Sequence, residues 1–308
     1  MISKPVLSYS KTSLSKTLFS KKRQPKKHIF SLPALTTLFA ISLLSACASI
    51  VPSKDLTKLY VFDCGDIEVR DLSIFTPGIN EGQVKQMTDS CYLIQHEKGM
   101  LLWDAGLSDS LGPKGIDAWE GKFHLSVSHP LAEQLEEINI KPIDIDFIGI
   151  SHFHGDHTGN ANLFTQAALL IQQEEYDVAF GDDPAAAGFN PDSYKDLDKS
   201  KIKITSGDFD VFGDGTVVIK RAVGHTPGHQ VLFVDLAESG PILLSGDLYH
   251  FTDNRTNKRV PSFNFNKAQT LESMEKIEAF VEQKKAQLWI QHDLEQNKAI
   301  KHAPAYYQ

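Results

Sequence analysis

Residues 151–160 constrain this chain more than any other segment, because they place three histidines and a carboxylate close together. The segment reads Ser-His-Phe-His-Gly-Asp-His-Thr-Gly-Asn, and its candidate metal ligands are His152, His154, Asp156 and His157. Imidazole nitrogens and carboxylate oxygens are ligands that zinc and similar divalent metals prefer. The preceding residues, 143–150, are apolar and rich in isoleucine, which predicts a buried strand. Side chains on a tight loop after a strand can converge on one point, whereas on a helix these four would spread over several faces.

Three further candidate ligands occur later in the chain, each just after a predicted strand. The strands are predicted at 216–222, 241–244 and 288–290, and the polar residues that follow them are His225, Asp247 and His292. A polar residue after a strand is held by a rigid scaffold. A lone histidine is more often structural, but four ligands within six positions and three ordered partners favour a metal site.

The order of the predicted elements indicates an α/β fold. Strands occur in two runs, each followed by helices, and 267–284 has the apolar stripe of a helix that packs on a core. Residues 180–200 form an irregular excursion between the runs. This order predicts two packed sheets with helices outside, a four-layer αββα sandwich.

These motifs, in this order, resemble the metallo-β-lactamase superfamily. Residues 152–157 fit its H-x-H-x-D-H motif, and Trp103-Asp104-Ala105-Gly106 fits its early Asp-x-Gly turn. His225, Asp247 and His292 fit its later ligand positions, so the resemblance runs from about residue 57 to the end.

The resemblance implies a centre of two metal ions. His152, His154 and His225 would hold the first ion; the second would be held by Asp156, His157 and His292, with Asp247 bridging the two. An all-nitrogen and oxygen ligand set suits two Zn²⁺ ions, although iron, manganese and cobalt remain open. Such a centre activates water near neutral pH and polarises a carbonyl.

Two other residues of these motifs are expected to support the ligands. The family's ligand is the first histidine of Gly224–His229, so His229 is expected to contact a ligand without binding metal. Asp104 is expected to stabilise the metal loop. The isolated histidines His96, His124, His129 and His302 are expected at the surface.

Within the superfamily, the chain is most similar to the N-acyl-homoserine lactonase group. Asp89–Ile94 precedes the early Asp turn as in those lactonases, and 224–230 resembles their third-ligand motif. The tail at 291–298 resembles their closing Gly-His-Asp-Ile-Glu-Gln, with Gln291 in place of glycine. The resemblance implies ring opening of an N-acyl-homoserine lactone, a quorum-quenching activity.

One departure from that group concerns the catalytic residues. Its members carry, three residues after the bridging aspartate, a tyrosine that polarises the substrate carbonyl. This chain has His250 there and Tyr249 one residue earlier, so either residue, or neither, would be the donor. Asp156 would relay a proton to the leaving group.

Other functions stay open at this point. Another hydrolase of the same fold, a thioesterase, β-lactamase or general esterase, is the first alternative, and a non-catalytic periplasmic zinc-binding protein is the second. Residues 251–265 either border the substrate pocket with their aromatic rings or pack as a surface loop on the core.

The first 46 residues predict export. Residues 1–28 carry eight cations and no acid, residues 29–46 are mainly apolar, and Leu44-Ser45-Ala46-Cys47 resembles a lipobox. We therefore divide the chain into a signal peptide (1–46), a tether (47–57) and a hydrolase domain (58–308), with a lipid on Cys47. An uncleaved anchor and a plain signal peptide are the alternatives, and all three export the domain. A lipidated Cys47 followed by Ala48 would place it on the periplasmic face of a bacterial membrane, with the outer membrane favoured.

Charge and cysteine content limit the partners further. Without its first 46 residues, which hold eight of the 31 cations and none of the 39 acids, the chain has a net charge of −16. A domain with this negative charge does not attract the phosphate backbones of nucleic acids, which argues against a nuclease. The small lactone or ester substrate is what the family resemblance implies. Cys64 and Cys91 either pair in an oxidising periplasm or remain buried thiols.

Overall fold

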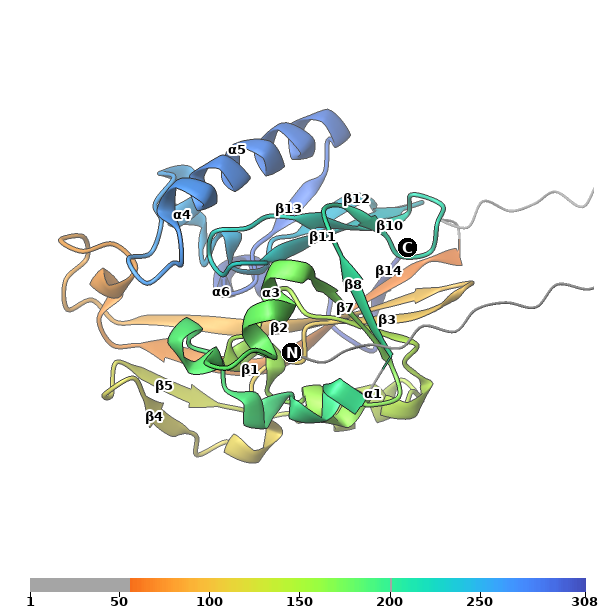
Figure 1. Ribbon diagram of the computed structural model, residues 1–308, viewed down its shortest axis with the longest axis horizontal. Helices are drawn as coiled ribbons and strands as arrows, with labels where there is room; N and C mark the ends of the chain where they lie inside the picture. Colours follow the sequence, from red (N-terminus) through yellow and green to blue (C-terminus); the bar gives the residue numbers. More distant parts are fainter. Residues whose placement is uncertain (1–55, 200) are drawn as a thin grey trace, which may run out of the picture. The chain divides into compact units, whose positions relative to one another are not determined.

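Two β-sheets pack face to face, and helices cover their outer faces (Figure 1). The computed structural model describes residues 56–308 except residue 200, so the predicted signal peptide, lipobox and Cys47 lie outside the described residues. The structure therefore has the four layers of an αββα sandwich, which confirms the fold predicted from the sequence.

The first sheet has nine strands in the order β4-β5-β1-β2-β3-β6-β7-β8, with β14 paired to β1. Their bounds are β1 (Lys58–Val69), β2 (Lys85–His96), β3 (Gly99–Trp103), β4 (Ile116–Ala118), β5 (Phe123–Ser126), β6 (Phe147–Gly149), β7 (Ala168–Gln172), β8 (Ile202–Thr205) and β14 (Tyr306–Tyr307). The second sheet has five strands in the order β13-β12-β11-β10-β9. They are β9 (Phe209–Asp210), β10 (Val217–Arg221), β11 (Gln230–Leu236), β12 (Gly240–Leu244) and β13 (Gln287–Trp289).

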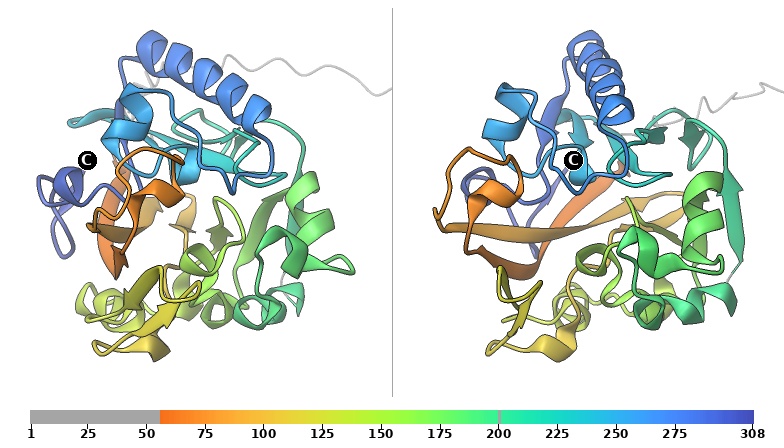
Figure 2. Two further views of the ribbon diagram at one scale, coloured as in Figure 1. Left: turned by 90° about the vertical axis from the view of Figure 1, so that its left-hand side faces the viewer. Right: turned by 60° about the vertical axis from the view of Figure 1, so that its left-hand side comes forward.

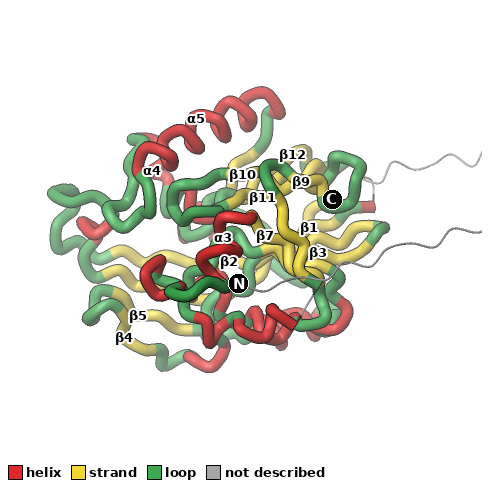
Figure 3. Tube along the Cα trace, in the orientation of Figure 1, coloured by secondary structure: helices red, strands yellow, loops and turns green. Residues whose placement is uncertain are grey.

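The helices of the described chain are short apart from one. They are α1 (Leu131–Glu137), α2 (Gly155–Thr158), α3 (Gln173–Ala179), α4 (Thr252–Thr256), α5 (Lys267–Lys284) and α6 (Leu294–Asn297). Figure 3 shows that helices lie on the outer sides and strands between them. Within residues 56–199 and 201–308, no helix combines the length and hydropathy that a membrane span requires.

Side-chain alternation along the central strands builds two separate cores. On β1, Leu59 and Val61 point into the space between the sheets, while Tyr60 and Phe62 point to the outer face. The core between the sheets continues through Trp103 on β3 and the inner faces of β10, β11 and β12. Both faces of these strands are therefore buried.

Apolar side chains of the helices cover the outer faces of both sheets. Leu131 and Leu135 of α1, with Phe164, cover the outer face of the first sheet. Met274 and Ile277 of α5 cover the second, and Figure 2 shows α5 along the outside of that sheet.

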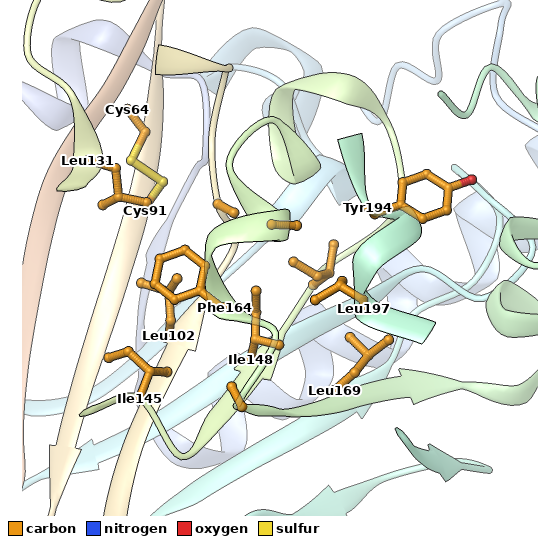
Figure 4. Packing of buried hydrophobic residues seen from close by; sticks show 14 of the residues in the cluster. Cys64, Cys91, Leu102, Leu131, Ile145, Ile148, Phe164, Leu169, Tyr194 and Leu197 are labelled. Carbon is orange, nitrogen blue, oxygen red and sulfur yellow. A yellow bond between two sulfur atoms is a disulfide. The ribbon is translucent and has the colours of Figure 1, made fainter. Parts of the chain in front are cut away.

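A disulfide joins two neighbouring strands of the first sheet. Cys64 of β1 and Cys91 of β2 are bonded within the outer core (Figure 4), which decides between the two states that the sequence left open. Gly106, after β3, packs against this bond with a φ of +61°, and a Cβ there would lie 2.4 Å from Cys64 Cβ. Only glycine fits this turn, because it satisfies both the left-handed conformation and the close approach.

The structure corrects the sequence prediction for four strands, β1, β4, β5 and β6. The strand predicted at 143–150 is reduced to Phe147–Gly149, because Pro142–Asp144 forms a 3-10 turn. The strand predicted at 59–62 extends to Val69 past a bulge between Asp63 and Gly65. The β4–β5 hairpin was not predicted.

Candidate metal centre

Polar loops that follow strands of both sheets meet at one edge of the sandwich. The loop after β6 carries residues 152–157, and the loops after β10, β12 and β13 carry His225, Asp247 and His292. β10 and β12 both run antiparallel to β11, and β12 runs parallel to β13, so these three strands end at the same edge. The structure brings all seven predicted ligands into three overlapping groups, and within each group the ligand atoms lie within 4.8 Å of one another.

Three imidazole nitrogens form a nearly equilateral triangle. His152 Nε2 lies 2.9 Å from His154 Nδ1, and His225 Nε2 lies 3.1 Å from each of them. The three rings are mutually perpendicular, with interplanar angles of 88°, 88° and 90°. A tetrahedral zinc with Zn–N bonds of about 2.0–2.1 Å requires donors roughly 3.3 Å apart, close to these spacings.

The hydrogen bonds behind this triangle show that a cation fits its centre. His154 Nε2 donates to the Ala187 carbonyl at 3.1 Å, and His225 Nδ1 donates to Asn264 Oδ1 at 3.0 Å. A neutral imidazole carries one N–H, so His154 Nδ1 and His225 Nε2 turn lone pairs toward each other across 3.1 Å. Such lone pairs repel unless a positive ion lies between them.

A second group surrounds the other oxygen of Asp247. Asp247 Oδ1 lies 3.0 Å from His292 Nε2 and 3.4 Å from His157 Nε2. Asp156 is more distant, with its carboxylate oxygens 3.9 Å from His157 Nε2 and 3.8 Å from His292 Nε2. His157 Nε2 is buried without a hydrogen-bond partner, which is unusual for a polar atom and fits a metal ion held between it and Asp247 Oδ1.

The protonation equilibria of the two groups differ. Burial and neighbouring imidazoles hold the pKa of His152 well below its usual range, and burial does the same for His225. Burial also disfavours the cationic form of His157 and His292, but the surrounding carboxylates outweigh it, raising the pKa of His157 well above normal and that of His292 to about 9. Without a metal, the second group therefore binds protons, which a divalent cation would displace.

The rings of the second group are also fixed from behind. His157 Nδ1 lies 3.1 Å from Asp104 Oδ2, and His292 Nδ1 donates to the Thr88 carbonyl at 2.9 Å. Asp104 also accepts from the backbone N–H of Ser151 at 2.6 Å, so it supports the metal loop as expected. These contacts leave each Nε2 free to face a metal.

His229 contacts a ligand from behind. Its Nδ1 donates to the Ala222 carbonyl, and its Nε2 accepts from the backbone N–H of Asp247, both at 2.9 Å. Burial lowers the pKa of His229 to about 4, so the ring stays neutral. Both nitrogens are occupied, which leaves none for a metal.

A buried carboxylate that the sequence analysis missed joins two of the ligand loops. Glu175, in α3, accepts from the backbone N–H of Phe153 at 2.9 Å and from that of Gly228 at 2.7 Å. Phe153 lies between His152 and His154, and Gly228 is three residues after His225. A Cβ on Gly228 would lie 2.4 Å from the Glu175 backbone nitrogen, so the close approach requires glycine. No sequence signal distinguishes Glu175 from its exposed neighbours on a helix.

The two candidate carbonyl donors point in opposite directions. Tyr249 is extended, with φ −140° and ψ 139°, and its hydroxyl donates to Glu278 Oε1 at 2.8 Å within the core under α5. His250 faces the metal ligands instead, with Nε2 3.1 Å from Asp247 Oδ2. The structure thus brings His250 to the site and directs Tyr249 away from it.

A cavity of about 560 Å³ opens above the ligands. His154, Asp156, His225, Asp247, His250 and His292 form its polar floor. Its walls are mainly apolar and come from β1, β2, the β4–β5 hairpin and the segment before α5. Phe263 and Phe265 line the cavity, so the segment after Asp247 borders the pocket, one of the two readings left open by the sequence.

One isolated histidine departs from expectation. His96 is buried rather than exposed, stacks on Phe212 with ring centroids 4.2 Å apart, and lies 3.1 Å from Asp214. Neither of these contacts involves a candidate metal ligand. His96 is the last residue of β2, and its position beside the hairpin turn gave no sequence signal of this burial.

Similarity to known proteins extends over most of the described chain. Residues 87–282 match the family described as the metallo-beta-lactamase superfamily. The N-acyl homoserine lactonase AttM of Azorhizobium caulinodans is 31% identical over 265 residues, which cover 81% of this chain and 98% of that protein. An N-acyl homoserine lactonase of a Bacillus species is 28% identical over 259 residues, with the same two coverages of 81% and 98%.

A solved structure shows the same fold. An N-acyl homoserine lactone hydrolase with the product N-hexanoyl-L-homoserine at its catalytic metal centre is 27% identical, with a TM-score of 0.71. The similarity covers 81% of this chain and 98% of that one. The family match covers more than half of this chain, and both relatives and this structure are covered almost completely.

Replacing Glu175 with glutamine tests the buried carboxylate through pH. Burial raises the pKa of Glu175 to about 7 from 4.5, so the folded state holds this proton more tightly than the unfolded state. The favourable contribution is complete below pH 4.5 and is lost as pH rises through 7, which amounts to about 3 kcal/mol. We expect the free energy of unfolding of the wild type, relative to Glu175→Gln, to fall by about that amount between pH 5 and pH 8.

Denaturant unfolding of the metal-free protein at both pH values measures this difference. Glutamine turns an amide donor toward one backbone N–H, but that cost is the same at both pH values and cancels. A wild-type and variant difference that does not change with pH would contradict the assignment.

Proposed function

This chain belongs to the metallo-β-lactamase superfamily, and we propose that it opens the ester ring of N-acyl-homoserine lactones. Its relatives are N-acyl homoserine lactonases, which are metal-dependent hydrolases of ester bonds. The ligand cluster supports the same class of chemistry, and we propose two zinc ions as the natural metals.

The observation that carries the substrate proposal is the composition of the cavity. None of the described residues that line it is a lysine or an arginine. A β-lactam or a glutathione thioester carries a carboxylate, which a protein normally binds with a cationic side chain. A neutral lactone with an apolar acyl chain matches both the missing cations and the apolar walls.

The chemistry divides between metal and protein. Two ions held by the seven ligands would supply an activated water and polarise the ester carbonyl. His250 Nε2 lies 3.1 Å from Asp247 Oδ2, and we propose that its N–H is shared between this carboxylate oxygen and the carbonyl oxygen as negative charge develops on the latter. Asp156, which lines the cavity and is only partly buried, would carry a proton to the alkoxide of the opened ring.

A hydrolysis panel tests the substrate. The zinc-loaded soluble domain is assayed with homoserine lactones, simple lactones, thioesters and β-lactams, and its metal content is measured in parallel. We expect the highest kcat/KM with N-acyl-homoserine lactones and loss of activity on chelation. Two metals bound with no turnover of any substrate would instead favour a zinc-binding protein, and preference for a thioester or β-lactam would refute the lactone.

A matched pair of variants tests the donor. His250→Ala is expected to lower kcat about 10²-fold, the usual effect of removing one donor to a developing oxyanion. Tyr249→Phe, the adjacent control, is expected to leave kcat within about twofold, because its hydroxyl bonds Glu278 instead of the site. Equal losses in both variants would contradict this assignment.

We also propose that the protein is exported as a lipoprotein through Cys47 and faces the periplasm. The basic and apolar composition of residues 1–46 and the Leu-Ser-Ala-Cys sequence support this. The disulfide between Cys64 and Cys91 supports export independently, since such bonds persist in oxidising compartments.

Metabolic labelling tests this localisation. When the full chain is expressed in a bacterial host with an alkyne-tagged fatty acid, we expect label on the wild type and none on Cys47→Ala. The Cys64→Ala, Cys91→Ala double variant is the control and should keep its label. An unlabelled wild type that is cut elsewhere would point to a plain signal peptide.

A further inference from the structure

Exposed apolar side chains gather at the end of the domain where the cavity opens. Of the ten large apolar side chains that are exposed among the described residues, five lie in the three segments 72–85, 112–123 and 252–267. These segments make up one sixth of the described chain, so they hold three times as many as an even spread would give. The five side chains, which we call the apolar rim, are between 38% and 63% exposed: Ile79, Val84, Ile116, Trp119 and Phe265.

The three segments form one surface because they meet around the ring of Phe263. The centroid of this ring lies 5.6 Å from that of Phe75 in the first segment and 5.5 Å from that of Trp119 in the second. The segment after β1, the β4–β5 hairpin and α4 lie at the same end of the domain (Figure 1, Figure 2). Three of the five rim residues line the cavity while remaining exposed, so the apolar rim borders its mouth.

The charge of this surface is opposite to that of the domain. The three segments carry seven cationic and four acidic residues, a net charge of +3. The described residues together carry 22 cationic and 38 acidic residues, a net charge of −16. Lys114, Lys258 and Lys267 are exposed on these segments. A positive surface on an acidic protein attracts an anionic partner to this one face.

The partner must match the exposed apolar side chains and the positive charge together. A nucleic acid matches the charge but not the apolar rim. A second copy of this chain matches the apolar rim, but two positive surfaces placed against each other repel. A bilayer that contains anionic lipids matches both, because its surface attracts lysine and arginine and its boundary layer accepts apolar side chains.

We propose that the apolar rim docks on an anionic phospholipid bilayer. Tryptophan and aliphatic side chains enter the boundary between head groups and acyl chains, and the lysines beside them contact the lipid phosphates. Docking places the mouth of the cavity against the bilayer, so an amphiphilic substrate dissolved in the lipid enters the cavity directly. The docking itself does not depend on the proposed lactonase function.

Vesicle binding by the soluble domain tests the proposal. Residues 48–308 contain every residue of the hydrophobic cores and lack Cys47, so this domain folds and no attached lipid contributes to binding. We expect it to bind vesicles of mixed phosphatidylglycerol and phosphatidylcholine about tenfold more tightly than vesicles of phosphatidylcholine alone, with a loss of binding in high salt. Equal binding to both vesicles, or binding to neither, would overturn the proposal.

Two double variants test the surface itself. Ile79→Asp with Val84→Asp changes two rim residues that do not line the cavity, and Lys258→Glu with Lys267→Glu reverses two exposed cations. We expect the charge reversal to weaken binding to the anionic vesicles about thirtyfold, the effect of losing two cations near such a surface. The apolar pair should lose at least about tenfold, because two apolar side chains no longer enter the bilayer.

A matched variant makes the same two kinds of change elsewhere. Ile143 precedes β6, whereas the metal loop follows this strand, so Ile143 lies at the opposite end of the domain. Ile143→Asp with Lys298→Glu should therefore bind the anionic vesicles within about twofold of the wild type. A loss as large as that of the rim variants would show that total charge governs the binding and would overturn the proposal.

The fluorescence of Trp119 reports which face meets the lipid. Of the three tryptophans, Trp103 and Trp289 are buried, so Trp119 is the one that a bilayer reaches. We expect brominated lipids in the anionic vesicles to quench the emission, and Trp119→Phe to remove the quenching while the domain still binds. Binding without quenching in the wild type would place the contact on another face and overturn the proposal.

Sedimentation without vesicles separates the bilayer from a second copy of the chain. We expect the wild-type domain and Ile79→Asp with Val84→Asp to sediment alike as monomers. A wild-type dimer that the apolar pair dissociates would show that the apolar rim is an interface between copies and would overturn the proposal. None of these measurements uses turnover, so a failure of the lactonase function in the hydrolysis panel leaves their outcome unchanged.

Discussion

The buried carboxylate of Asp247 is the interaction on which the rest of the structure depends. Five imidazole nitrogens, from His152, His157, His225, His250 and His292, lie between 3.0 and 3.7 Å from its two oxygens. Removing a carboxylate from water costs several kcal/mol unless opposite charge or hydrogen bonds compensate. The imidazole rings must therefore converge on this carboxylate. The two-sheet architecture allows this because several strands end at the same edge, where the loops that carry the rings begin.

A rigid layer behind the ligands makes this convergence possible. Asp104, Glu175 and the carbonyl of Thr88 each connect a ligand loop to a different element of the fold. Fixing the outer nitrogen of a ring selects which nitrogen faces the metal, so ligand geometry is set before any ion arrives. The ligand side chains therefore have little conformational freedom, and the contacts with the surrounding fold compensate for the entropy lost in ordering them.

The sequence predicted the parts of this site that are local in the chain. The spacing of His152, His154, Asp156 and His157 is readable because these side chains share one loop, and the layers followed from the order of strands and helices. The sequence did not predict contacts between residues that are distant from one another in the chain. The direction of Tyr249 depends on which side of an extended backbone faces α5, and the pairing of Cys64 with Cys91 depends on the register of β1 and β2.

The sequence analysis missed Glu175 and the β4–β5 hairpin for a related reason. Glu175 resembles any acidic residue at the start of a helix, and its role exists only because Phe153 and Gly228 arrive from other strands. The β4–β5 hairpin alternates apolar and polar residues over only a few positions around Glu120-Gly121, too short a run to separate from a loop. Both elements act through contacts between distant parts of the chain.

The direction of β1 carries a consequence for how the enzyme meets its substrate. The described chain enters this strand at Lys58, whereas Ile67, near its other end, lines the cavity. Nine residues of extended strand separate these positions by about 30 Å. The described chain therefore begins near one end of β1, and the cavity lies near the other end. At this distance, the start of the described chain does not restrict the access of a substrate from the aqueous phase to the cavity.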